Sequence, residues 1–236
     1  ISLTEKAKSY LIEHFNIPTS KISVIPCCVD IEHFKISNHE AIEKKRKELN
    51  LNQDKFILSY LGAIGTWYML PEMLDFFKVL LNKKPYAVFL FITGEEPKNI
   101  TKIAIQKNIP LANIRIIKAS RKEVPVLLGI SQYSIFFIKP VFSKMASSPT
   151  KLAEIMSLGI PVIANRGVGD VDKILQNNKL GFLVEDFNRE DYLQVINQLD
   201  VSFSKENLIN CAKENFSLEK GVHEYLKIYK ALIPKS

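Results

Sequence analysis

The sequence predicts an α/β fold: a doubly wound, Rossmann-like parallel sheet with helices on both faces. Short apolar runs, which suit strands buried on both sides, alternate with amphipathic segments along nearly the whole chain. The connections between consecutive apolar runs contain helices, as parallel pairing of strands requires. Because the sequence has no internal repeat, low-complexity tract or linker, we expect one domain over residues 1–236.

The elements follow from hydrophobic periodicity and from helix start and stop signals. The first helix is expected over residues 4–15, with Thr4 as its cap and Leu11, Ile12 and Phe15 on its inner face. Further helices are expected over 40–49, 70–81, 100–107, 122–130, 149–158, 170–176, 188–199, 204–214 and 217–232. Strands are expected over 22–25, 55–61, 87–93, 114–117, 134–138, 160–164 and 182–184. Ligands bind at the carboxyl ends of strands in such a fold, so the loops there are the place to look for a site.

The composition limits the kinds of partner that the chain is expected to bind. The 236 residues carry a net charge of +7, but the lysines are spread along the chain, which argues against a nucleic-acid footprint and leaves an anionic small ligand or an anionic lipid surface. Three cysteines and four scattered histidines predict neither a disulfide framework nor a metal site, and a reducing cytoplasm is expected. No apolar run has the length of a membrane span, and Ile1 opens no signal peptide, which suggests a chain cut from a longer one.

The stretch from Ser147 to Asn165 is typical of a loop followed by a short helix, a glycine that ends the helix, and a buried strand. Ser148 is predicted to be the N-cap, with Pro149 in the first helical position. Lys151 and Glu154 are three residues apart near the positive end of the helix dipole, where they could hold a phosphate and a ribose hydroxyl. The alternative is a helix–strand junction with a solvated ion pair.

Other strand-end loops are weaker candidates. Gly62–Thr66 follows a strand and precedes a helix, so its backbone N–H groups could approach a phosphate, although a tight turn explains the glycines equally well. This loop is neither the dinucleotide fingerprint nor a Walker loop. Trp67 is expected to pack against the core, with stacking on a sugar as the alternative. Lys118 and Ala119 end another strand, where backbone groups could pair with a base edge. Asp170 is expected to cap the helix that follows it.

Residues 154–164, Glu-Ile-Met-Ser-Leu-Gly-Ile-Pro-Val-Ile-Ala, resemble the E-x-M-x-x-G-x-P-V-I-A signature of GT-B glycosyltransferases of families 1 and 4. Other landmarks resemble that family in the same order: Val24–Pro26, Val29–Asp30, Phe34, Tyr60–Gly62, Gly181–Val184 and the closing helix with Tyr229. The resemblance covers nearly the whole chain and implies only the C-terminal, nucleotide-sugar-binding half of the GT-B fold. The acceptor domain is then absent from this chain, which ends in helices over about 188–232.

The family's residues carry over unevenly. Its ribose-binding glutamate falls on Glu154, but its earlier glutamate falls on Ala146, and its usual Arg and Lys after the first glycine loop are missing. Cys27–Cys28 also replaces the usual Asn-Gly. The resemblance therefore implies that the diphosphate is held by these groups: Lys151, Ser148, Thr150 and the loop with Gly62, Gly65 and Thr66. Lys151 is the candidate catalytic residue, because its charge would stabilise the leaving diphosphate.

The implied activity is transfer of a sugar from a nucleotide-diphosphate sugar, with retention and without a metal or other cofactor. The acceptor is expected to be a glycan or a lipid-linked sugar held by the missing domain, in the cytoplasm or peripherally at the inner face of the membrane. We expect the isolated chain to bind nucleotide but to transfer little sugar. Two alternatives stay open: a non-catalytic nucleotide-binding or interaction module, and an isomerase resembling nucleotide-sugar 2-epimerases.

Overall fold

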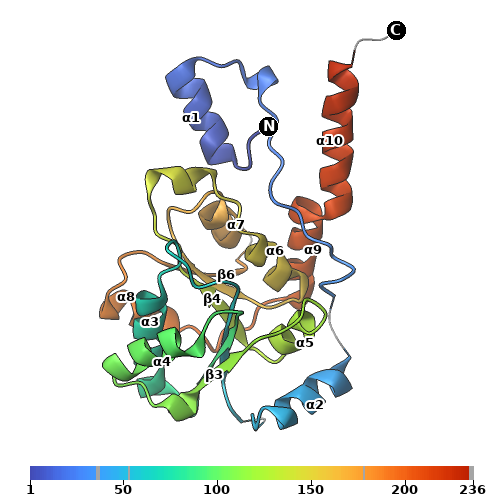
Figure 1. The fold of residues 1–236 in the computed structure, drawn as a ribbon. Coiled ribbons are helices and arrows are strands. Elements are labelled where there is room, and N and C mark those ends of the chain that lie inside the picture. The colour runs from blue at the N-terminus through green and yellow to red at the C-terminus, as the bar shows by residue number, and fades with distance from the viewer. Residues whose placement is uncertain (36–37, 53, 178, 234–236) are drawn as a thin grey trace.

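A computed structural model describes residues 1–35, 38–52, 54–177 and 179–233, and it is built on a six-stranded, all-parallel sheet (Figure 1). The strand order is β3-β2-β1-β4-β5-β6. The strands are β1 (Ile57–Leu61), β2 (Val88–Ile92), β3 (Ile114–Ile117), β4 (Tyr133–Phe136), β5 (Val162–Asn165) and β6 (Gly181–Val184). This order is that of a doubly wound Rossmann-like sheet, so the predicted fold class is confirmed. Its topological switch point lies between β1 and β4.

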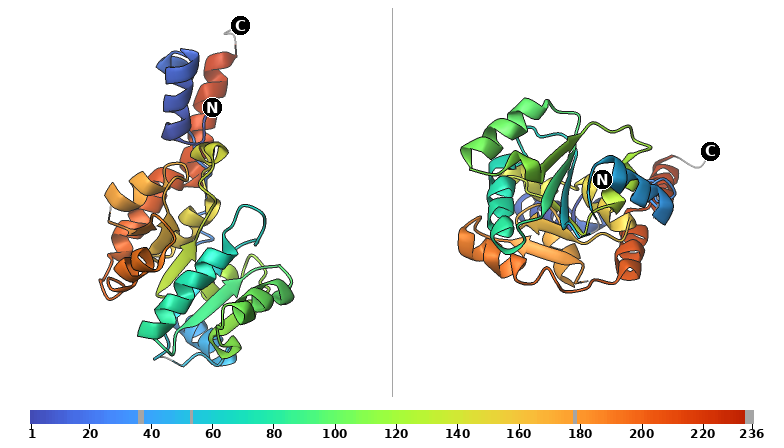
Figure 2. Two further views of the ribbon diagram at one scale, coloured as in Figure 1. Left: turned by 90° about the vertical axis from the view of Figure 1, so that its left-hand side faces the viewer. Right: turned by 90° about the horizontal axis from the view of Figure 1, so that it is seen from below.

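Helices cover both faces of the sheet (Figures 1 and 2). On one face lie α3 (Leu70–Lys83), α4 (Pro97–Gln106) and α8 (Arg189–Ile196). On the other lie α2 (His39–Glu48), α5 (Val124–Gly129), α6 (Thr150–Ser157) and α9 (Lys205–Phe216). The remaining helix of this body is α7 (Val171–Asn177), which packs against β5 and β6. Every residue of the four inner strands is buried, which explains why their sequences are continuous apolar runs.

Two helices project from this body, α1 (Glu5–Phe15) and α10 (Leu218–Leu232) (Figures 1 and 2). Thr4 caps α1 as predicted, accepting a hydrogen bond from the N–H of Ala7. The predicted inner face of α1 is largely wrong, because α1 has no fully buried residue and Phe15 is exposed. Helix α10 likewise exposes an apolar stripe of Leu218, Val222, Tyr225, Leu226, Tyr229 and Leu232.

Two further predictions were wrong. Residues 22–25 form no strand; Val24 makes an isolated bridge to Ser2, since the sheet offers this segment no partner. Pro149, not Ser148, is the N-cap of α6, because the Ser148 hydroxyl accepts a hydrogen bond from the N–H of Cys27. By contrast, Asp170 does stand directly before α7, where its carbonyl accepts from the N–H of Ile174. Its carboxylate is used at the start of α1, accepting from the N–H groups of the first two residues of that helix.

Short 3₁₀ helices lie in three connections: η1 (Thr19–Lys21), η2 (Leu111–Asn113) and η3 (Phe142–Ala146). The last of these leads into α6 and contacts α1. The Thr4 hydroxyl donates to the carbonyl of Met145 in η3 at 2.7 Å. The chain before α1 is therefore fixed to the segment that precedes the candidate site.

Candidate functional site

The candidate site lies at the switch point, where the carboxyl ends of β1 and β4 meet the start of α6. The loop Gly62–Thr66 leaves β1 here, and Lys151 enters from the first turn of α6. Its amine lies against aromatic rings that come from β1, from β4 and from the loop after β1. Open α/β sheets bind their ligands in this crevice, so the topology itself directs attention to Lys151.

Lys151 is 7% exposed, which is rare for a lysine. Its Nζ donates to the Tyr60 hydroxyl at 3.2 Å and lies 3.6 Å from the centre of the Tyr68 ring and 4.4 Å from that of Tyr60. Gly62 has φ +112°, and a Cβ there would lie 3.1 Å from the amine. A glycine is thus required both by the backbone conformation and by the close approach of Lys151.

The electrostatic state of Lys151 follows from these contacts. Burial lowers the pKa of Lys151 to about 7, while the negative charge of Glu154 acts in the opposite direction. Within the described residues, no ion pair joins Lys151 to a carboxylate. The amine therefore lies at the carboxyl edge of the sheet, where no carboxylate of the described residues compensates its charge by direct contact, and a bound anion would favour its protonated form.

Glu154 lies one turn further along α6 and is half-buried. Burial raises the pKa of Glu154, and the positive charges of Arg121, Lys151 and His33 act against this rise. The His33 ring shares a hydrogen bond of 3.0 Å with the Arg121 carbonyl, and the Arg121 guanidinium lies over the Phe34 ring at 5.5 Å. Segments distant in sequence thus bring basic groups to the predicted ribose ligand.

Sequence reasoning missed the two basic residues near Glu154. Arg121 belongs to the strand-end segment that begins at Lys118, so its position was a usable signal. His33 gave no signal, because its neighbourhood depends on the path of the chain before the first strand. Neither residue stands at a recognisable spacing from Glu154 in the sequence.

The other predicted site residues are distributed unevenly. Gly65, Thr66 and Thr150 are exposed on the loop after β1 and on the first turn of α6. Lys118 is exposed and Ala119 half-buried after β3, two strands away from β1 on the same edge of the sheet. The structure thus brings Lys151 into direct proximity with Gly62, whereas the two residues after β3 lie further along the edge.

Trp67 does not pack in the core, and that prediction was wrong. The side chain is 47% exposed, and the Lys144 Nζ lies 4.1 Å from its ring centre. The following residue, Tyr68, is the one that turns inward, where its ring covers the Lys151 amine. A single-residue difference in register along this loop therefore decides which aromatic ring is buried.

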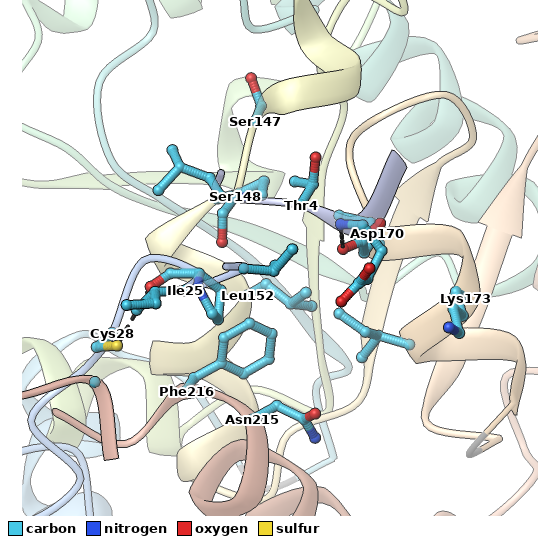
Figure 3. Close-up of a pocket in the computed structure, with 18 of the residues that line it drawn as sticks. Thr4, Ile25, Cys28, Ser147, Ser148, Leu152, Asp170, Lys173, Asn215 and Phe216 are labelled. Atoms are coloured by element: carbon cyan, nitrogen blue, oxygen red, sulfur yellow. Dashed lines mark hydrogen bonds between the residues drawn. The ribbon is translucent and has the colours of Figure 1, made fainter. Parts of the chain in front are cut away.

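Ser148 faces a separate cavity of about 400 Å³ between the N-terminal segment, α7 and the α9–α10 corner. Figure 3 shows Ser148, Leu152 and Phe216 around it. Lys151, Glu154 and the Gly62–Thr66 loop do not line this cavity. Ser148 and Lys151 are therefore presented to different spaces, although only two residues separate them.

Two further properties of the described residues bear on the kind of site. No group of three His, Cys, Asp or Glu side chains in this part of the chain is placed to hold a metal ion. Among the helices described, none combines the length and apolar character needed to cross a membrane.

The fold and the placement of Lys151 define a Rossmann-like domain with a buried lysine at its switch point, and comparison with known proteins identifies its family. The model of the family described as "Glycosyl transferases group 1" matches residues 41–214. That match covers more than half of the chain, so the chain belongs to the group 1 glycosyltransferases.

Curated relatives are distant and longer. The UDP-Gal:alpha-D-GlcNAc-diphosphoundecaprenol alpha-1,3-galactosyltransferase of Escherichia coli is 23% identical over 235 residues, which cover 97% of this chain and 59% of that protein. The capsular polysaccharide biosynthesis glycosyltransferase CapM of Staphylococcus aureus is 23% identical over 214 residues, covering 88% of this chain and 53% of that protein. The chain therefore spans little more than half the length of these relatives.

Solved structures share the fold. A glycosyltransferase from Rickettsia africae matches with a TM-score of 0.76 at 20% identity, over 99% of this chain and 63% of that one. Anabaena Alr3699/HepE, solved in complex with UDP and glucose, matches with a TM-score of 0.76 at 15% identity, over 98% of this chain and 62% of that one. At these identities the likeness establishes the architecture.

Proposed function

We propose that this chain is the donor-binding part of a glycosyltransferase and that it binds a UDP-sugar at the β1/β4 switch point. The observation that carries the proposal is Lys151, a buried amine that contacts no carboxylate of the described residues and lies beside Gly62, where an anionic ligand would enter. Membership of the group 1 family supports a nucleotide-sugar donor. Two similar proteins, the E. coli galactosyltransferase that takes UDP-Gal and the HepE complex with UDP and glucose, favour UDP as the nucleotide.

In this proposal Lys151 contacts the diphosphate and Glu154 accepts hydrogen bonds from the ribose. As the glycosidic bond breaks, negative charge develops on the leaving diphosphate, and donors already in place stabilise it more than they stabilise the bound substrate. Lys151 supplies a charge, and the loop Gly62–Thr66 supplies backbone N–H groups. Retention of configuration and independence of metal belong to the proposal through the family resemblance alone.

The acceptor side of the reaction is also a proposal. The relatives named above act on a diphosphoundecaprenol-linked sugar or take part in capsular polysaccharide biosynthesis, according to their names. A lipid-linked or polysaccharide acceptor at the cytoplasmic face of a membrane is the corresponding proposal here. Because the relatives are longer, we propose that the acceptor is held by a further domain and that residues 1–236 alone transfer little sugar. Efficient sugar transfer by residues 1–236 alone would refute the proposal that a further domain is needed to hold the acceptor.

Isothermal titration calorimetry with UDP, GDP and ADP tests the donor site. We expect UDP to bind most tightly of the three nucleotides. Lys151→Met should lower the affinity for UDP by roughly tenfold or more, which corresponds to the loss of one charged hydrogen bond. Lys102→Met removes an exposed lysine of α4 and serves as the matched charge control, for which no change is expected. Equal affinities in the two variants would contradict the proposal, and no binding of any nucleotide would favour an interaction module.

Glu154 has a sharper test than loss of affinity. If its carboxylate accepts from the ribose 2′-hydroxyl, the native protein should discriminate between UDP and 2′-deoxy-UDP. Glu154→Met keeps a side chain of similar length and removes both acceptor oxygens, so this discrimination should fall towards unity. An unchanged ratio would show that Glu154 does not contact that hydroxyl.

A further inference from the structure

A buried tyrosine joins the two parts of the proposed diphosphate site. Tyr60 lies within β1, and its residue exposure is 0%. Its hydroxyl donates to the carbonyl of Ala63 at 2.6 Å and accepts from the Lys151 Nζ at 3.2 Å. One hydroxyl group therefore contacts both the glycine loop and the lysine of α6.

The hydrogen-bond capacity of a phenol fixes the direction of these two bonds. A tyrosine hydroxyl has one hydrogen, and the Ala63 carbonyl can only accept, so that hydrogen is committed to the loop. The oxygen then offers its lone pairs to Lys151, whose amine donates. Burial raises the pKa of Tyr60 far above its ordinary value, with Tyr68 and Glu95 adding to the rise, so the hydroxyl keeps its hydrogen throughout the usual pH range.

We propose that Tyr60 is a positioning residue, whose hydroxyl holds the Lys151 amine and the Gly62–Thr66 loop in the arrangement that receives the diphosphate. The inference rests on the proposed function, because it assigns Tyr60 a role through Lys151. A phenylalanine would fill the same space among Tyr68 and Phe91, so the ring explains the packing and the hydroxyl is left for the link. Tyr60 itself need not touch the ligand.

The neighbouring Tyr68 provides a matched comparison. Its ring also covers the Lys151 amine, at 3.6 Å, but no hydrogen bond joins its hydroxyl to another described residue. Tyr60→Phe and Tyr68→Phe therefore each remove one hydroxyl and keep one ring over the amine. Only Tyr60→Phe removes the link between the lysine and the loop.

The experiment measures UDP affinity for both phenylalanine variants, each with Lys151 present and with Lys151→Met, by calorimetry between pH 6 and pH 9. We expect Tyr60→Phe to weaken UDP about fivefold when Lys151 is present, the equivalent of one net hydrogen bond, and to have no further effect in Lys151→Met. Tyr68→Phe should have a clearly smaller effect. Thermal unfolding of each variant establishes that it is folded at the temperature of the titration.

The pH profile separates positioning from packing. The titratable groups facing the amine are the Tyr60 and Tyr68 hydroxyls and, along its own helix, Glu154. Loss of the Tyr60 oxygen removes an acceptor that favours the ammonium form, so the pH at which UDP affinity declines should move to a lower value. Lys151→Met lacks this titration and reports any ionisation of UDP itself.

The possible outcomes of this experiment lead to different conclusions about Tyr60 and Lys151. An equal loss of affinity from Tyr60→Phe in both backgrounds, with an unmoved pH profile, would assign the hydroxyl a merely structural role and overturn the inference. No loss from Tyr60→Phe while Lys151→Met weakens UDP would also overturn it and leave the proposed function standing. If Lys151→Met binds UDP as the native protein does, the proposed function fails first.

Discussion

Replacing Lys151 by methionine should stabilise the protein while it weakens nucleotide binding. Methionine has a similar length and no charge, so it fills the same buried space without the penalty of burying an ammonium group. In the unfolded chain the pKa of lysine is about 10.4, whereas burial lowers the pKa of Lys151 in the folded protein to about 7. Between these values the unfolded state binds more protons, so the native protein gains stability as the pH rises from 7.

The size of this gain can be worked out from the two pKa values. Each unit of difference corresponds to about 1.36 kcal/mol, so the native free energy of unfolding should contain a Lys151 contribution that rises by about 3 kcal/mol between pH 7 and pH 9.5. The Tyr60 and Tyr68 rings favour the ammonium by about 1 kcal/mol, which reduces the expected rise to about 2 kcal/mol. Lys151→Met lacks this contribution altogether.

Urea denaturation of the native protein and of Lys151→Met, at matched pH values from 6.5 to 9.5, measures the contribution as a difference. Groups that titrate in both proteins cancel in this comparison. We expect the variant to be more stable at pH 7 and its advantage to shrink by about 2 kcal/mol at pH 9.5. A pH-independent difference, or a variant less stable than the native protein at pH 7, would refute the reasoning that burial sets the state of this amine.

Three other substitutions, the first with a matched control, test the surroundings of the site. Gly62→Ala places a Cβ 3.1 Å from the Lys151 amine in a residue with φ +112°. It should weaken UDP binding roughly tenfold and lower the free energy of unfolding by about 1–2 kcal/mol. The control is Gly65→Ala, whose Cβ would meet nothing within 4 Å and which should have smaller effects on both quantities. Asn165→Ala removes buried hydrogen bonds of 2.8 and 2.9 Å that join the chain leaving β4 to β5, and urea denaturation should show a loss of about 2–3 kcal/mol. Asp170→Ala removes the acceptor for the first two N–H groups of α1, so hydrogen exchange should accelerate in α1 while the sheet remains protected. Unchanged exchange in α1 would show that this carboxylate does not hold the helix.

Most of the fold could be predicted because its four inner strands are buried on both faces. A continuous apolar run such as Val88–Ile92 needs no alternation, and β2 occupies those residues, within the expected range 87–93. The run 22–25 has the same local character but lies outside the sheet, so composition alone could not separate it from a true strand. Strand identity depends on a pairing partner, and the sequence near residue 22 does not show that the backbone there bridges to Ser2 and not to the sheet.

The place of the candidate site in the fold could be predicted, but its geometry could not. The spacing of Lys151 and Glu154 and the fold class together place both residues at the ligand edge of the sheet. Nothing in the sequence shows that Lys151 is buried, because its enclosure depends on Tyr60 and Tyr68, which approach from the far side of the switch point. The same tertiary dependence explains Ser148, whose hydroxyl is occupied by a backbone group 121 residues earlier.

The burial of Lys151 is easier to explain by ligand binding than by stability. A structural role at this position would be served by an apolar side chain, since a buried amine without a carboxylate in contact lowers the stability of the ligand-free protein. The same desolvation strengthens the attraction between the ammonium and an incoming diphosphate, because no water has to be removed from the amine when the ligand arrives. A free-protein pKa near 7 then leaves the amine partly neutral, and binding of the anion completes its protonation. The buried Lys151 side chain therefore lowers the stability of the unliganded protein and raises its affinity for an anion.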